Sequence, residues 1–215
     1  TNSGMAQFKS YFSGEKEPPH PRVTTSQKCF RTTDIEEVSD DTRLTMFEML
    51  GNFSFGNYFK NEACRWALDL LTKQFGLDPE RLYFTVYTTD DEAEAIWRDL
   101  GIPSDRIYRF GDEDNWWGPA GDEGVCGPSS EINYYRGSLD DVPMIDDPVR
   151  DTQWGPNYHE DFVELYNLVF TQFYRDLDGK DTVLPAKNID TGMGFERMLA
   201  VLQGVSNVYE TDAFL

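Results

Sequence analysis

Short runs of β-branched and aromatic residues follow one another directly along this chain, and this feature limits its fold more than any other. Residues 22–33 (RVTTSQKCFRTT) and 44–55 (LTMFEMLGNFSF) are two such runs, separated by an acidic loop. Consecutive strands joined by a polar loop form an antiparallel hairpin. Further strands are expected at 81–89, 105–111, 129–135 and 162–177, and a helix is the alternative for the start of the last segment. The sequence therefore predicts an α+β fold with a largely antiparallel sheet.

Three segments have the pattern of helices, and they cover residues 57–76, 90–101 and 191–204. In the first, apolar side chains recur at helical spacing and a glycine follows the last of them. We expect the residues with this spacing to face the core, namely Phe59, Ala63, Trp66, Leu70 and Phe75. The remaining stretches predict a glycine-rich loop from 112 to 128, an exposed excursion over 137–160 and a turn over 178–187.

The charge of the chain argues against tight binding of nucleic acid by these residues alone. Among 215 residues, 39 are acidic and 19 are basic, which gives a formal net charge of -20 at pH 7. A surface of this sign repels polyphosphate at long range. Solubility, or a cell with a salty interior, is the simplest reason for such an excess of acid.

Cysteine and histidine content indicates the compartment. The chain has 3 cysteines, which are widely separated, and only 2 histidines. Neither a disulfide framework nor a structural zinc site is expected from this set, and the cytoplasm is the expected location. We find no apolar run long enough to cross a membrane and no secretory signal. Both ends of the sequence suggest a piece of a longer chain.

Two arginines are candidates for binding phosphate. Arg31 lies at the end of the first hairpin strand, and Arg197 lies on the last predicted helix after two glycines. An arginine presents a planar fork of donors that matches phosphate oxygens. A surface salt bridge is the more common role of a lone arginine on a strand. The position of Arg197 near a helix start favours a phosphate role.

Residues 188–198 (NIDTGMGFERM) place an acid and two glycines inside an apolar frame. Asp190 has two interpretations of about equal weight. It could cap the last helix, which aspartate does well, or it could hold a cation such as an ammonium group if Thr191 is the cap instead. Glycine weakens a helix, so Gly192 suggests that something approaches the backbone closely.

Two further side chains could form part of a small pocket. Trp117 is one of two adjacent tryptophans in the glycine-rich loop, so that at least one of them could face a cavity. The alternative is a hydrophobic plug beneath the loop. Asn167 lies within a strongly apolar strand, where a buried amide must be hydrogen-bonded, either in a core network or to a ligand.

Four blocks in their order along the chain are similar to the catalytic domain of the alanyl-tRNA synthetase family. They are TTSQKCFR…TMFEMLGNFSFGNYF, DNWW…GVCGPSSEI, YNLVFTQF and IDTGMGFERMLAVLQG. The resemblance extends over nearly the whole chain, 1–215. It implies a class II synthetase fold, in which an antiparallel sheet is flanked by helices. It also implies a partial catalytic domain, without the family's N-terminal helix and without its downstream tRNA-recognition, editing and C-terminal domains.

The resemblance implies roles for seven residues. Arg31 resembles the motif 2 arginine that grips the α-phosphate of ATP, and Arg197 the motif 3 arginine on the far side of the nucleotide. Phe47 resembles the ring that stacks on adenine. Asp190 corresponds to the acid that binds the ammonium group of alanine. The walls and floor of the amino-acid pocket would be Trp117, Asn167 and Gly192.

The implied activity is that of an alanine–tRNA ligase, which uses ATP and Mg²⁺ to form alanyl-adenylate and then charges tRNA(Ala). No metal ligand is assigned within these residues, and zinc is expected only in the editing domain. Two alternatives stay open: a related enzyme that adenylates a small amino acid for another acceptor, and an inactive binding module. The chain also departs from the family, with a shortened loop after Arg31, Arg43-Leu44 in place of paired histidines, and Tyr135 in place of an aspartate.

Overall fold

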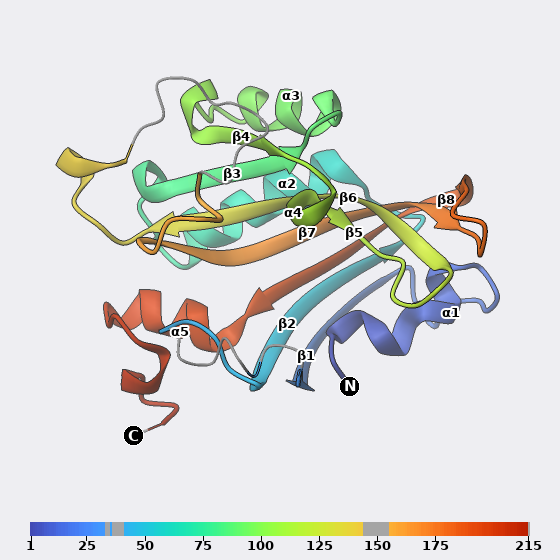
Figure 1. Ribbon diagram of the computed structural model, residues 1–215, viewed down its shortest axis with the longest axis horizontal. Coiled ribbons are helices and arrows are strands. Elements are labelled where there is room, and N and C mark those ends of the chain that lie inside the picture. The colour runs from blue at the N-terminus through green and yellow to red at the C-terminus, as the bar shows by residue number, and fades with distance from the viewer. Residues whose placement is uncertain (33–34, 36–40, 144–154, 215) are drawn as a thin grey trace.

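One eight-stranded sheet organises the chain, and the computed structural model describes residues 1–32, 35, 41–143 and 155–214 (Figure 1). The strand order is β1-β2-β8-β7-β6-β3-β4, with β5 pairing to β6 outside this path. Every pair is antiparallel except β3 with β4, which confirms the predicted α+β class. The strands are β1 (Arg22–Phe30), β2 (Met46–Phe55), β3 (Leu82–Tyr87), β4 (Ile107–Phe110), β5 (Trp116–Trp117), β6 (Gly124–Tyr135), β7 (Phe162–Arg175) and β8 (Asp181–Gly194).

The helices are short, and α2, α3 and α5 supply most of the helical packing. The α-helices are α1 (Lys9–Phe12), α2 (Lys60–Asp69), α3 (Asp91–Asp99), α4 (Asp112–Asn115) and α5 (Phe195–Gln203). A π-helical turn, η3 (Leu70–Gln74), continues α2. Single 3₁₀ turns are η1 (Gly4–Phe8), η4 (Pro79–Arg81), η5 (Ser104–Arg106), η6 (Leu139–Asp141) and η7 (Val208–Glu210).

The two faces of the sheet are covered differently. Apolar residues of α2, α3 and α5 pack against one face and form the main core, which includes Ile189 and Met193 of β8. On the other face, the N-terminal segment contributes Met5 and Phe8 to a second cluster around Phe53 of β2. Ser3 and Met5 of the N-terminal segment also line a cavity on this second face.

Strand β8 is longer than the sequence suggests, and two predictions around it are wrong. The turn predicted over 178–187 ends early, because β8 begins at Asp181. The last helix begins at Phe195 rather than Thr191, because residues 188–193 pair with β7 and both ends of the stretch 188–194 pair with β2. Two glycines in this stretch make it a poor helix former, and sheet hydrogen bonds on both sides outweigh the helical pattern.

The loop predicted over 112–128 is also too long, because β6 begins at Gly124 and includes the Gly127–Pro128 pair. In α2, the predicted core position Trp66 is wrong, since its side chain is 43% exposed. The buried stripe is formed instead by Ala63, Cys64, Ala67 and Leu71. Small side chains let α2 approach the sheet closely, whereas Trp66 packs at the edge against Tyr58.

Two predicted surface segments are only partly described. Most of the acidic loop after Arg31 lies outside the described residues, and so does 144–154 within the predicted excursion. The described end of that excursion is not simply exposed, since Gly155 and Pro156 are buried. No described helix is both long enough and apolar enough to span a membrane.

Candidate active site

Strand alternation brings several of the predicted residues onto the sheet face opposite α2 and α3. In β8, Ile189 and Met193 point into the main core, so Asp190 and Gly192 point the other way. Gly192 pairs with Asn167 of β7, and Asn167 pairs in turn with Glu131 of β6. Side chains of three neighbouring strands therefore meet in one row.

The hairpin supplies two more side chains to the same face. Phe47 lies opposite Cys29 in the β1–β2 pairing, and Arg31 follows the last residue of β1. The Arg31 guanidinium carbon lies 5.2 Å from the centre of the Phe47 ring. Its Nε donates to the carbonyl of Asn2 at 2.8 Å. Within the described residues, both terminal nitrogens of Arg31 have no acceptor, which leaves them available to an anion.

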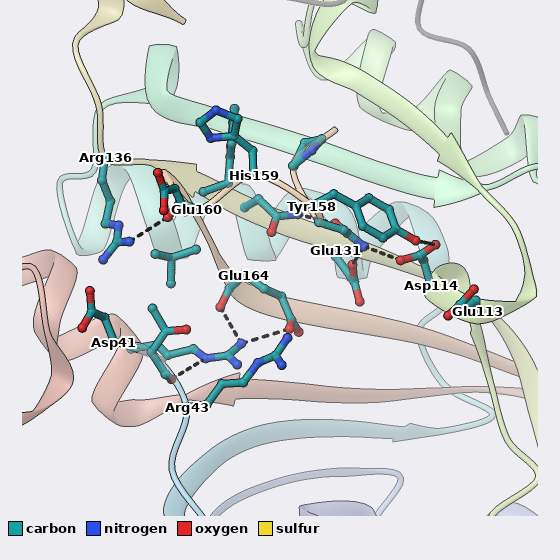
Figure 2. A pocket seen from close by; sticks show the side chains of 17 residues that line it. Asp41, Arg43, Glu113, Asp114, Glu131, Arg136, Tyr158, His159, Glu160 and Glu164 are labelled. Atoms are coloured by element: carbon teal, nitrogen blue, oxygen red, sulfur yellow. Dashed lines mark hydrogen bonds and ion pairs between the residues drawn. The ribbon is translucent and has the colours of Figure 1, made fainter. Parts of the chain in front are cut away.

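All seven residues predicted for the site line one cavity of about 350 Å³. A second cleft of about 740 Å³ continues from it and shares Glu131, Glu164, Arg43, Thr42 and Arg197 (Figure 2). The seven residues that meet in the first cavity are Arg31, Phe47, Trp117, Asn167, Asp190, Gly192 and Arg197.

Asp190 is a buried acid without a counter-charge. Its side chain is 6% exposed, and no hydrogen bond or ion pair joins it to another described residue. Burial raises its pKa to about 7. The capping interpretation is wrong, because the N-cap of α5 is Gly194, and Thr191 binds Asn52 of β2 instead. A buried carboxylate without a partner is costly, and an incoming cation would relieve that cost.

Both tryptophans pack against apolar side chains, Trp117 against the cluster around Phe53, and Trp117 also lines the cavity. Trp116 stacks on Phe173 with ring centres 5.9 Å apart, so it acts as the hydrophobic plug. Strand β5 can pair with β6 here because β6 is irregular after Cys126. A methyl group at Gly127 would lie 2.1 Å from the carbonyl oxygen of Phe170, so only glycine allows this approach.

Gly192 has no side chain and therefore leaves space at the base of the cavity. A methyl group at this position would lie 3.0 Å from the sulfur of Met49 on β2. Met49 itself lines the cavity. Any larger residue at 192 would therefore fill space beside Asp190 that a small ligand could use.

Arg197 is held from two sides. Its Nε donates to the carbonyl of Thr42 at 3.1 Å, and its Nη1 donates to the Glu164 carboxylate at 3.0 Å. The ion pair between Arg197 and Glu164 lies at the wall of the cavity. In the described part of the chain Nη2 has no acceptor, so one edge of the guanidinium can still receive an anion.

Sequence reasoning missed two acids of the cavity, Glu131 and Glu164. Glu131 is 7% exposed, and burial, with Glu164 and Asp114 nearby, raises its pKa well above the usual range. A charged residue within an otherwise buried strand was a usable signal for it. Glu164 carried no such signal, because alternation places it on the opposite face from Asn167. An extra residue in β7 at Leu165 reverses that alternation.

The described residues contain no group of three or more His, Cys, Asp or Glu side chains placed to hold a metal ion. The cavity is lined by three arginines, Arg31, Arg43 and Arg197, by an indole, and by a buried acid that has no partner among the described residues. Such a set suits a small molecule that carries both an ammonium group and a phosphate.

Comparisons with known proteins agree with this chemistry. The family profile described as "tRNA synthetases class II (A)" matches residues 1–215. The chain is 52% identical over 215 residues to an alanine–tRNA ligase of Dehalococcoides mccartyi, covering 100% of this chain and 24% of that protein. For the alanine–tRNA ligase of Rubrobacter xylanophilus the identity is 48% over 223 residues, covering 100% and 25%.

A probable alanine–tRNA ligase of Ostreococcus tauri, named as chloroplastic/mitochondrial, is 53% identical over 218 residues, covering 99% of this chain and 21% of that protein. Among solved structures, a histidyl-tRNA synthetase of S. aureus superposes with a TM-score of 0.49 at 16% identity, covering 94% of this chain and 51% of that one. The chain thus spans about a quarter of the length of the curated relatives it matches.

Proposed function

Because the chain belongs to the class II (A) tRNA synthetases, we propose that it is the alanine-activating part of an alanyl-tRNA synthetase. The observation that carries this proposal is Asp190, a buried acid that has no partner among the described residues, in a cavity that Arg31 and Arg197 also line. The activity would convert alanine and ATP into alanyl-adenylate and pyrophosphate.

The amino acid would bind at the Asp190 end of the cavity. Its ammonium group would meet the Asp190 carboxylate, and ionisation of that acid would become favourable once the cation is present. Trp117 and Gly192 would leave room for about a methyl group. Such a pocket excludes valine by bulk but rejects glycine by only about 1–3 kcal/mol and serine weakly, because small differences in size carry little energy.

The nucleotide would bind at the hairpin end. Phe47 offers an aromatic face for adenine. The terminal nitrogens of Arg31 and Nη2 of Arg197, which have no acceptor among the described residues, would bind phosphate oxygens. The two arginines extend from different parts of the fold, one after β1 and one on α5. An α-phosphate held between them would be fixed in position for attack by the alanine carboxylate.

Within this arrangement the reaction needs no nucleophilic side chain. The alanine carboxylate attacks the α-phosphate in line, the bond to pyrophosphate breaks, and the arginines stabilise the charge that develops. Mg²⁺ would neutralise the phosphates of ATP, and it commonly binds through only one or two carboxylates in addition to phosphate oxygens. Glu164, which lies beside Arg197 and lines both cavities, is the carboxylate suited to that role.

We propose further that these residues act as one partial catalytic domain within a longer cytoplasmic protein. Transfer of alanine to tRNA(Ala) would then depend on parts beyond this sequence, because a net charge of -20 is unsuited to holding RNA. All three cysteines are buried free thiols, which suits a reducing compartment.

Amino-acid-dependent exchange of pyrophosphate into ATP tests the proposal. The complete protein is assayed with alanine, glycine, serine and valine in parallel. We expect rapid exchange with alanine, slower but measurable exchange with glycine and serine, and none with valine. Exchange that depends on a different amino acid, or binding of ATP without any exchange, would refute the proposal.

A further inference from the structure

Glu131 is a buried acid of the cavity to which the reaction above assigns no task. It lies near the middle of β6 and lines both the cavity and the adjoining cleft, and its side chain is 7% exposed. Burying a carboxylate costs free energy unless hydrogen bonds compensate it. An acid kept in this place therefore calls for a specific role.

Three donors meet the Glu131 carboxylate. The amide nitrogen of Asn167 donates to Oε1 at 3.0 Å, and that of Asn157 donates to Oε2 at 2.8 Å. The hydroxyl of Thr85 reaches Oε2 at 3.4 Å. Figure 2 shows Glu131 between Tyr158 and Glu164 in the wall of the cleft. Both amides turn their NH₂ groups toward Glu131, whose carboxylate oxygens accept these hydrogen bonds.

The hydrogen bond from the Asn167 NH₂ group to Glu131 also fixes the position of the amide oxygen, Oδ1. Its Oδ1 is buried and has no hydrogen-bond partner among the described residues. A buried acceptor without a donor costs free energy until a donor arrives. Asn167 pairs with Gly192, and Asp190 lies two residues from Gly192 on the same face of β8. The amide oxygen and the Asp190 carboxylate are therefore neighbouring acceptors without donors.

We propose that Glu131 is a positioning residue for the amino acid: it holds the NH₂ group of Asn167 and so presents the amide oxygen to the ammonium group. The inference rests on the proposed function of the cavity. An ammonium group has only donors, so it needs acceptors on more than one side. Without the Glu131 carboxylate, the Asn167 amide can turn by half a rotation and present its own donors, which an ammonium group cannot use.

A purely structural role is the competing explanation, since Glu131 also binds Asn157 in the segment before β7. The two roles differ in their kinetic effects. A positioning role acts on alanine and works through Asn167. Loss of a structural role would disturb the whole cavity and raise KM for ATP as well as for alanine. That effect would be the same with or without the Asn167 side chain.

The test is alanine-dependent pyrophosphate exchange in the complete protein with four variants. Glu131→Gln keeps the shape of the side chain but can offer a donor, so it no longer fixes the amide. We expect it to raise KM for alanine about tenfold or more and to change KM for ATP less than about twofold. Asn157→Ala removes a different donor to the same carboxylate and should change KM for alanine less than about threefold.

The other two variants complete a double-mutant cycle. Asn167→Ala alone should raise KM for alanine, and adding Glu131→Gln to it should have little further effect, because the partner is already gone. An unchanged KM for alanine in Glu131→Gln, additive effects in the cycle, or an equal rise in KM for ATP would overturn the proposal.

Absence of exchange in the wild-type protein and misfolding of a variant have different meanings for the proposal. If wild-type protein shows no alanine-dependent exchange, the proposed function itself fails. If Glu131→Gln does not fold, as judged by thermal melting, Glu131→Asp replaces it, because it keeps the charge and moves it back from Asn167. An unchanged KM for alanine in Glu131→Asp would overturn the proposal, and so would the failure of both variants to fold, since the acid would then belong to the core.

Discussion

Asp190 shows at the scale of one residue how function and stability oppose each other. Its pKa lies at about 7 rather than the ordinary 3.8, because burial disfavours the charged form. The folded state therefore holds the proton more tightly than the unfolded state. The stability linked to this proton is complete below pH 4 and is lost as the pH rises to 7.

We predict that Asp190→Asn stabilises the fold at high pH while it weakens alanine binding. The rise in pKa from 3.8 to about 7 corresponds to a loss of roughly 4 kcal/mol in the free energy of unfolding once the acid is fully ionised. In denaturant unfolding, the substitution should raise the free energy of unfolding by about 2–3 kcal/mol more at pH 8 than at pH 5. KM for alanine should rise sharply in the same variant. A gain that is the same at both pH values would contradict the assigned burial of the charge.

Arg31 gives a second prediction at this scale. Among the described residues its side chain makes one hydrogen bond, to the carbonyl of Asn2, and it packs over the Phe47 ring. Arg31→Ala should therefore fold with little loss of stability. Loss of a positioned cation at the α-phosphate should slow pyrophosphate exchange by about 10²-fold or more.

The matched control is Arg175→Ala, which breaks an exposed ion pair with Asp181 at the start of β8. This variant should keep near wild-type exchange. If Arg31→Ala also exchanges pyrophosphate at the wild-type rate, the assignment of Arg31 to ATP is wrong.

At the scale of strands and helices, the site depends on irregular pairing. The extra residue at Leu165 places Glu164 on the site face, and the irregularity after Cys126 lets Trp117 reach the cavity. Period-2 alternation predicted the strands but could not predict these shifts, because a bulge depends on contacts with the partner strand. The same limit explains why residues 191–194 were predicted as helix, since local pattern does not reveal pairing with distant β7.

Gly127→Ala tests whether the irregularity in β6 is required. The new methyl group would meet the Phe170 carbonyl at 2.1 Å, and a backbone atom in a central strand cannot move aside easily. We expect a loss of about 3 kcal/mol in unfolding free energy. Gly111→Ala is the control, because its methyl group meets no atom within 4 Å and should change stability little. Equal stability of the two variants would contradict the close approach of β6 to β7.

At the scale of the whole molecule, the stabilising helices and the candidate site lie on opposite faces of the sheet. The helices α2, α3 and α5 bury one face of the sheet, and the cavity occupies the other face beside the N-terminal segment. The resemblance to a known family predicted seven of the residues that line the cavity, because each of them lies in one of the sequence blocks that carry the resemblance. Glu131 was missed although it is a charged residue within an otherwise buried strand. Glu164 could not be predicted, because it faces the cavity only through the extra residue in β7.

The net charge of -20 leads to a prediction for the isolated 215 residues. They should bind tRNA more weakly than about 10 µM at physiological salt, because the surface repels phosphate. A gel-shift titration measures this, with the complete protein as the positive control. Tight and alanine-specific tRNA binding by these residues alone would show that the partner surface lies here after all.

A crystal structure with a stable alanyl-adenylate analogue, in which a sulfamate replaces the phosphate, tests the central claim most directly. The account predicts one analogue in the cavity, with its ammonium nitrogen about 3 Å from the Asp190 carboxylate and its purine against Phe47. The sulfamate would lie between Arg31 and Arg197. An analogue bound only in the larger cleft, with Asp190 still lacking a partner, would contradict the account.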